Sequence, residues 1–196
     1  MERKIFEVKY HQLKVRIGKI KEHFDFQPGI NGLTPLQNDK IRGMLLLCHA
    51  EFESYIEGLA LLLVNDAKEK WDRTHRANYN LSSLLVSSTI DKKETVETKV
   101  NKMIVDYKTQ ITKNNHGIKE HNIKDIFEPL GYCIDDFDNV FIATLDSFGH
   151  DRGEVAHSSA KTSTMYDKAT EISRIDGIVR DLHDFQEALL LKSSQF

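Results

Sequence analysis

The scarcity of proline is the feature that most constrains what this chain can fold into. Among 196 residues there are only three prolines, Pro28, Pro35 and Pro129. Proline removes a backbone donor and clashes with the preceding turn, so the interior of a helix excludes it. The long stretch between Pro35 and Pro129 is therefore free to form extended helices.

Apolar residues recur at intervals of three and four along most of the chain, which is the period of a helix. The pattern predicts a first helix within residues 1–26, which includes Ile5 and Val8, and a connection from Gly29 to Pro35. A second helix, from Leu36 to about Trp71, has the widest apolar face, so we expect it to be the most buried and central one. Its predicted stripe consists of Ile41, Leu45, Cys48, Phe52, Tyr55, Leu59 and Leu62.

The remaining chain alternates between helical patterns and polar connections. Residues 73–88 predict a loop with short helical pieces, and residues 113–118 predict a loop. Further helices are predicted at 89–112, at 122–131, from an Asp135–Asp136 cap through Phe148, and from Asp167 nearly to the end. No alternating pattern typical of strands is present. We therefore predict an all-α bundle of about five to seven helices, a single domain over residues 1–196 with an N-terminal helix (1–26) and a core bundle (36–192).

Composition narrows the class of protein. With 40% hydrophobic and 29% charged residues the chain is an ordinary globular one, and its net charge of -3 gives no general attraction to nucleic acid. Cys48 and Cys133 lie in apolar surroundings without metal-ligand spacing, which predicts two buried, reduced thiols. Neither a signal-type leader nor a run of membrane-spanning length is found, so we expect a cytoplasmic protein with no membrane contact.

One short segment combines two residues with chemistry, Arg152-Gly-Glu-Val-Ala-His157. Arginine is a permanent cation whose donors fit a phosphate, and histidine gains or loses a proton near neutral pH. Such a pair is able to cleave RNA without a metal, although it also arises by chance. Five residues along a helix separate the side chains by about 140° and about 7.5 Å along the axis. The two groups converge on one phosphate only if the helix ends there or if a second copy supplies partners, so a homodimer is part of the hypothesis.

Polar residues also interrupt the stripe of the second predicted helix. Glu51, Glu53 and Glu57 either face water along its edge or, in the case of Glu53, point at Arg152 or His157 and orient them. His49 and Glu53, four residues apart, match two ligands of a metal site, but no further ligands follow at diagnostic spacing. We therefore predict no metal and no cofactor.

Three segments together resemble a known family. They are His49-Ala-Glu-Phe-Glu-Ser-Tyr-Ile56, the segment from Asn122 to Gly131 ending Phe-Glu-Pro-Leu-Gly, and Arg152 to His157 before a final helix. Over roughly residues 36–192 the chain resembles the HEPN superfamily, most closely the RiboL-PSP-HEPN group, which implies a HEPN-like helical bundle. Many members are metal-independent endoribonucleases whose arginine and histidine meet across a homodimer. Gly153 stands where that family often has a polar residue beside the arginine, which either weakens catalysis or shifts the polar role to Glu154.

The resemblance implies a function and a site. It implies an endoribonuclease with the catalytic residues Arg152, His157, Glu53 and Glu154, which cleaves RNA to a 2′,3′-cyclic phosphate without a cofactor. It also implies a toxin or a phage-defence effector, controlled either by a separate antitoxin or sensor protein or through its dimerisation. Two alternatives remain: a non-catalytic module that binds RNA, a nucleotide or a protein partner, and a purely structural dimerisation bundle.

Overall fold

The computed structural model describes residues 3–27, 32–87, 94–157 and 165–194, with the side chains of 154–157 and 194 left outside the description. Its main elements are α1 (Arg3–His23), α2 (Pro35–Thr74), α3 (Tyr79–Ser87), α4 (Val96–Thr109), α5 (Glu120–Phe127), α6 (Asn139–His157) and α7 (Lys168–Ser194). A π-helical turn (Gln110–Asn114) follows α4, and 3₁₀ turns occupy Glu128–Leu130 and Ile134–Asp136. No strand is found among the described residues, so the all-α prediction is confirmed.

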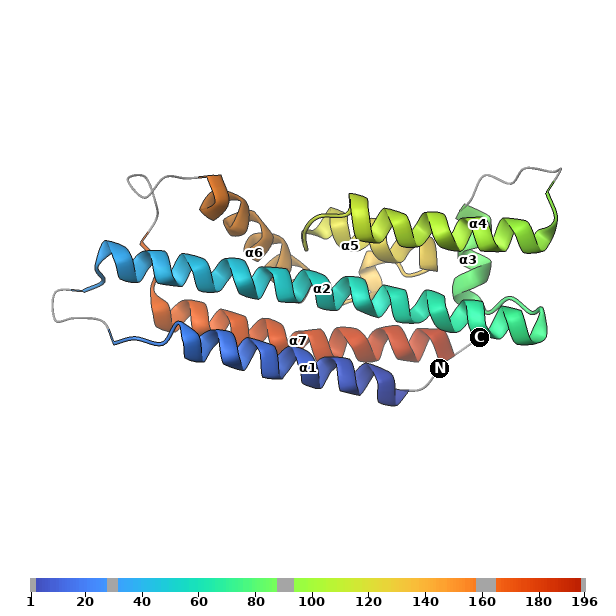
Figure 1. Cartoon of the computed structure of the whole chain (residues 1–196). Helices are drawn as coiled ribbons and strands as arrows, with labels where there is room; N and C mark the ends of the chain where they lie inside the picture. Colours follow the sequence, from blue (N-terminus) through green and yellow to red (C-terminus); the bar gives the residue numbers. More distant parts are fainter. Residues whose placement is uncertain (1–2, 28–31, 88–93, 158–164, 195–196) are drawn as a thin grey trace.

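Helix α2 is the axis of the bundle. It has 40 residues, which correspond to about 60 Å at 1.5 Å per residue. It contacts α1, α3, α4, α5, α6 and α7, and α1 and α7 run alongside it in Figure 1. Its side chains from Ile41 to Ala67 supply the largest share of the buried core. The prediction that this helix is the central one is confirmed.

The start of α2 has a clear local cause. Thr34 precedes it, its hydroxyl oxygen accepts a hydrogen bond from the Gln37 N–H (3.2 Å), and the Gln37 side chain accepts one from the Thr34 N–H (2.9 Å). This reciprocal arrangement is a capping box, and Pro35 occupies the first helical position, where no backbone donor is needed. The beginning of the helix is thereby fixed within one residue of the predicted position.

Several of the predicted helix boundaries are wrong, each for a local reason. Helix α4 begins at Val96 rather than at Thr89, because Thr95 caps it by accepting from the Thr98 N–H. Helix α6 is capped by Asp138, whose carboxylate accepts from the Phe141 N–H, whereas Asp136 closes the preceding 3₁₀ turn. The helical conformation after α4 continues to Asn114, so the loop begins at Asn115.

Burial departs from the prediction in α1 and at one cysteine. The buried face of α1 consists of Phe6, Leu13, Ile17 and Ile20, and the predicted Ile5 and Val8 are about half exposed. Cys48 is fully buried, but Cys133 is exposed, because it lies in the turn before Ile134–Asp136 rather than in a helix. No helix in the described part of the chain has the length and apolar character needed to cross a membrane.

Candidate functional site

Arg152 lies on an exposed face of α6, five residues before His157, the last residue of that helix as described. A Cβ atom at the neighbouring Gly153 would meet no other atom within 4 Å, so the backbone beside Arg152 is open. The Arg152 side chain is therefore accessible to solvent on this face of α6. The side chains of His157 and Glu154 lie outside the described residues.

The turn of α6 before Arg152 is held by Arg174 of α7. Arg174 donates from Nη1 to Asp151 Oδ2 (2.5 Å) and from Nη2 to Ser147 Oγ (2.9 Å). Its guanidinium also lies over the ring of Phe148, 5.0 Å from the centroid, in a cation–π contact. Three contacts to one helical turn fix the orientation of α6, and hence the direction in which Arg152 leaves it.

His49 of α2 is the buried neighbour of Arg152. It is 2% exposed, and its ring stacks on Phe148 with centroids 6.3 Å apart and an interplanar angle of 9°. Burial, together with the positive charge of Arg152, lowers the pKa of His49 to about 4. His49 is therefore neutral at pH 7, and the electrostatic effect places the Arg152 cation close to it.

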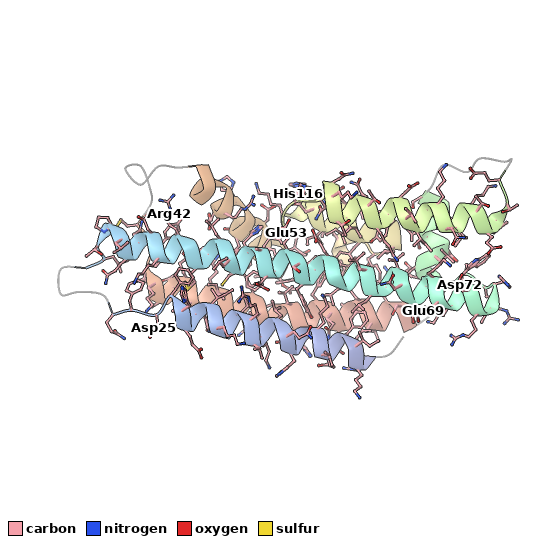
Figure 2. The ribbon with its side chains drawn as sticks, in the orientation of Figure 1. Asp25, Arg42, Glu53, Glu69, Asp72 and His116 are labelled. Carbon is pink, nitrogen blue, oxygen red and sulfur yellow. The ribbon has the colours of Figure 1, made fainter. Side chains whose placement is uncertain are left out.

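Glu53 lies one turn further along α2 and ties the helix to a loop. Its Oε1 accepts a hydrogen bond from the backbone N–H of Gly117 (2.6 Å), and its Oε2 is 3.7 Å from Nδ1 of His49. Figure 2 shows Glu53 near the middle of α2, on the side where His116 lies. Because His49 is neutral, the second contact is between a carboxylate and an uncharged ring rather than an ion pair.

The loop that Glu53 holds has a conformation that depends on glycine. Gly117 has φ of +134°, and a Cβ atom there would lie 2.9 Å from Oδ1 of Asn122. Asn122 in turn accepts from the Lys119 N–H and donates to Asn115, both at 3.1 Å. Asp146 of α6 accepts from the N–H of Glu120 (3.0 Å), which joins the start of α5 to α6. These contacts bring α2, the 115–118 loop and α6 together around His49.

The predicted site residues are thus brought together only in part. Glu53 contacts His49 and Gly117, and Arg152 influences the same histidine; no hydrogen bond joins Glu53 to Arg152 directly in the described part of the chain. Glu53 is 19% exposed and does not simply face water. Sequence reasoning missed Arg174, and it considered His49 and Glu53 as part of a metal site only to reject that interpretation.

The burial of His49 predicts a specific loss of stability in acid. The unfolded chain binds a proton at the ordinary histidine pKa of 6.5, whereas the folded state does so only near 4. Protonation of His49 therefore favours unfolding as the pH falls from 6.5 towards 4. Between pH 7 and pH 4.5 it lowers the free energy of unfolding by about 2 kcal/mol. Urea unfolding at both pH values measures it. His49→Gln should be less stable than the wild type at pH 7, but its free energy of unfolding should fall by about 2 kcal/mol less on acidification. Equal losses in the two proteins would contradict the low pKa of His49.

A second stability prediction concerns Glu53. Glu53→Ala leaves the N–H of the buried Gly117 without its acceptor, so we expect a loss of about 1–2 kcal/mol in the free energy of unfolding. Glu53→Gln keeps an oxygen that is able to accept, and should lose less than half as much. Urea denaturation of the two variants checks this order. Equal losses would show that the carboxylate charge, and not the hydrogen bond, carries the interaction.

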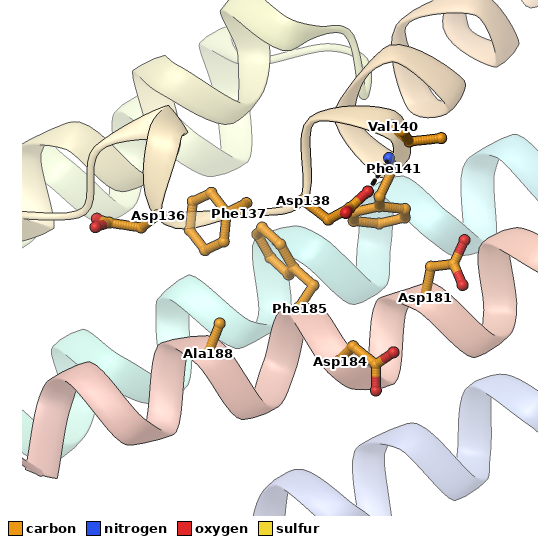
Figure 3. Close-up of a pocket in the computed structure, with 9 residues that line it drawn as sticks. All are labelled: Asp136, Phe137, Asp138, Val140, Phe141, Asp181, Asp184, Phe185 and Ala188. Carbon is orange, nitrogen blue, oxygen red and sulfur yellow. Dashed lines mark hydrogen bonds between the residues drawn. The ribbon is translucent and has the colours of Figure 1, made fainter.

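A cavity of about 470 Å³ lies elsewhere, between the start of α6 and α7 (Figure 3). It is lined by Asp136, Phe137, Asp138, Val140, Phe141, Asp181, Asp184, Phe185 and Ala188. None of the predicted site residues is among them. Four carboxylates around an aromatic floor repel a phosphate, so this cavity is not a candidate for binding RNA.

Comparison with known proteins identifies the family. The RiboL-PSP-HEPN family model matches residues 11–189. No curated protein and no solved structure matches the chain. The matched range includes α2, the 115–118 loop, α6 and nearly all of α7, and the resemblance noted from the sequence is confirmed. The chain belongs to the RiboL-PSP-HEPN family.

Proposed function

We propose that this protein is a metal-independent endoribonuclease of the HEPN type. The observation that carries the proposal is the exposed Arg152 on α6, five residues before His157, in a chain of this family. Arg174 and His49 support it, because they hold and surround the turn that carries Arg152. An accessible cation on a helical turn that is itself held in place is suited to bind a phosphate of RNA.

The reaction requires only groups that RNA and this chain supply. A base removes the proton of the ribose 2′-hydroxyl, the 2′-oxygen forms a bond to the adjacent phosphorus, and the bond from phosphorus to the 5′-oxygen breaks. An acid gives a proton to that 5′-oxygen, so the products are a 2′,3′-cyclic phosphate and a 5′-hydroxyl. His157 is the proposed acid and base, and Arg152 stabilises the negative charge that develops on the phosphoryl oxygens.

The two glutamates have supporting roles in this proposal. Glu53 acts through His49, since it contacts that ring and the loop beside it. Glu154 takes the polar position that Gly153 leaves empty. A neutral His49 adds no positive charge of its own beside Arg152.

The proposed enzyme is a homodimer with its active site at the interface. Positions five residues apart on an ideal helix differ by about 140° around its axis; we therefore propose that groups of the partner copy complete the site with Arg152 and His157. We further propose that residues 1–196 form one HEPN domain, located in the cytoplasm. Its proposed role is that of a toxin or phage-defence effector, restrained by a separate antitoxin or sensor protein.

A second candidate is a non-catalytic HEPN module that binds RNA, a nucleotide or a protein partner. The observation that favours it is Gly153, which leaves the position after Arg152 without the polar side chain that the family often has there. Such a module would use Arg152 to hold a phosphate but would not break the bond.

One experiment separates the two candidates. Purified protein is incubated with mixed cellular RNA in the presence of EDTA, and both cleavage and RNA binding are measured. The proposed enzyme leaves fragments with 2′,3′-cyclic phosphate ends despite chelation. If the wild type binds RNA without cleaving it, and Arg152→Ala no longer binds it, the non-catalytic binding module is established instead.

A further inference from the structure

Three metal-ligating side chains meet where α1 packs against α7. Glu7 belongs to α1, and His183 and Glu187 lie one turn apart on α7. A ligand atom from each of the three lies within 4.8 Å of the others, and Nε2 of His183 is 3.7 Å from Oε1 of Glu7. Ligands about 2 Å from a tetrahedral ion are about 3.3 Å apart. Small side-chain rotations therefore bring the three atoms to the spacing of a metal site.

Two independent features of the same place favour a bound cation. Oε1 of Glu187 is buried without a hydrogen-bond partner among the described residues, which is costly for a carboxylate oxygen. The ring of Tyr10 packs against His183 with centroids 4.7 Å apart, so the imidazole is held in position. This place combines a fixed nitrogen ligand with an excess of negative charge.

The types of ligand select the class of ion. An imidazole nitrogen with two carboxylates suits zinc and its neighbours in the first transition series, whereas Mg²⁺ and Ca²⁺ prefer oxygen ligands alone. No thiolate belongs to the group. Three protein ligands leave one tetrahedral position for water. We propose that Glu7, His183 and Glu187 form a zinc-class site that joins α1 to α7.

Arg3 is the built-in competitor for this site. Its Nη2 donates to Oε2 of Glu187, and its Nε is 4.0 Å from Oε1 of Glu7. The Arg3 side chain is 68% exposed, so it is able to swing into water when an ion arrives. The Arg3 guanidinium and a metal ion would therefore compete for the same two carboxylates. Because of this competition, removal of Arg3 should tighten metal binding.

The test is a calorimetric titration of Zn²⁺ into EDTA-treated, desalted protein. A Cys133→Ser background is used because Cys133 is exposed and a thiol is itself a zinc ligand. We expect His183→Asn and Glu7→Gln each to weaken Zn²⁺ binding at least about tenfold. The matched control His11→Asn, which removes an exposed histidine of the same α1, should leave the affinity unchanged.

Arg3 supplies a second comparison with the opposite sign. Arg3→Ala should tighten Zn²⁺ binding several-fold, whereas Lys4→Ala, which removes an adjacent exposed charge, should change it far less. Circular dichroism confirms that each variant is folded. The proposal is overturned if the wild type binds no Zn²⁺, if His183→Asn and His11→Asn bind equally well, or if Arg3→Ala and Lys4→Ala have equal effects. RNA cleavage is not part of this test, so its outcome is independent of the proposed ribonuclease activity.

Discussion

Replacing Arg152 by alanine is expected to reduce RNA cleavage at least about a hundredfold, which corresponds to roughly 3 kcal/mol of lost transition-state stabilisation. The side chain is exposed, so its truncation should leave the free energy of unfolding within about 0.5 kcal/mol of the wild type. Arg152→Lys keeps the charge but loses the two-pronged donor geometry, and should retain an intermediate rate. Initial cleavage rates under single-turnover conditions give the comparison.

The matched control is Arg180→Ala, which removes another exposed arginine, on α7, where it pairs with Asp181. It should cleave at the wild-type rate. A second readout belongs to Arg152 alone, because its charge contributes to the low pKa of His49. In Arg152→Ala that pKa should rise, while burial still keeps it below 6.5, and NMR titration of the histidine ring is able to follow it. If Arg152→Ala and Arg180→Ala cleaved RNA at equal rates, Arg152 would have no role in the reaction.

Replacing His157 by alanine should have the other large effect, a loss of about 10²- to 10⁴-fold in cleavage rate. The proposed role is proton transfer, so the loss should fall on the chemical step and not on binding. RNA affinity should therefore remain close to that of the wild type in His157→Ala, whereas Arg152→Ala should also weaken it. Filter binding at fixed salt, together with single-turnover rates, separates the two effects.

His11→Ala serves as the control for histidine removal, since His11 is exposed on α1. It should be fully active. The wild-type rate should also depend on pH in the neutral range, and the His157→Ala variant should lose that dependence. If His157→Ala retained both the wild-type cleavage rate and its dependence on pH, His157 would be neither the acid nor the base.

Helix type and order were predictable because they depend on local sequence. The capping box at Thr34 and Gln37, the apolar stripe of α2 and the cap at Asp167 all lie within a few residues of the boundaries they determine. The start of α6 was harder, because Asp135, Asp136 and Asp138 are all chemically suited to cap a helix. Only the path of the backbone assigns that role to Asp138.

The site itself was predictable only in its local part. Arg152 and His157 lie in one short segment, so the sequence alone shows them as a candidate pair, although their spacing alone does not single them out. The bond from Gly117 to Glu53 joins residues 64 positions apart, and Glu7 meets His183 from the opposite end of the chain. Such pairings depend on how helices pack, and a single sequence has no local signal for them. The role of Arg174 was missed for the same reason, because its partner Asp151 lies on another helix.

The most direct test of the central proposal uses a short RNA that the protein cleaves at one position in the presence of EDTA. The same RNA is prepared with a single 2′-deoxynucleotide on the 5′ side of that bond. If the 2′-hydroxyl is the nucleophile, cleavage at this position disappears, and the unmodified RNA yields a 2′,3′-cyclic phosphate and a 5′-hydroxyl. Cleavage that persists beside the deoxynucleotide, or products with 5′-phosphate ends, would contradict the proposed mechanism.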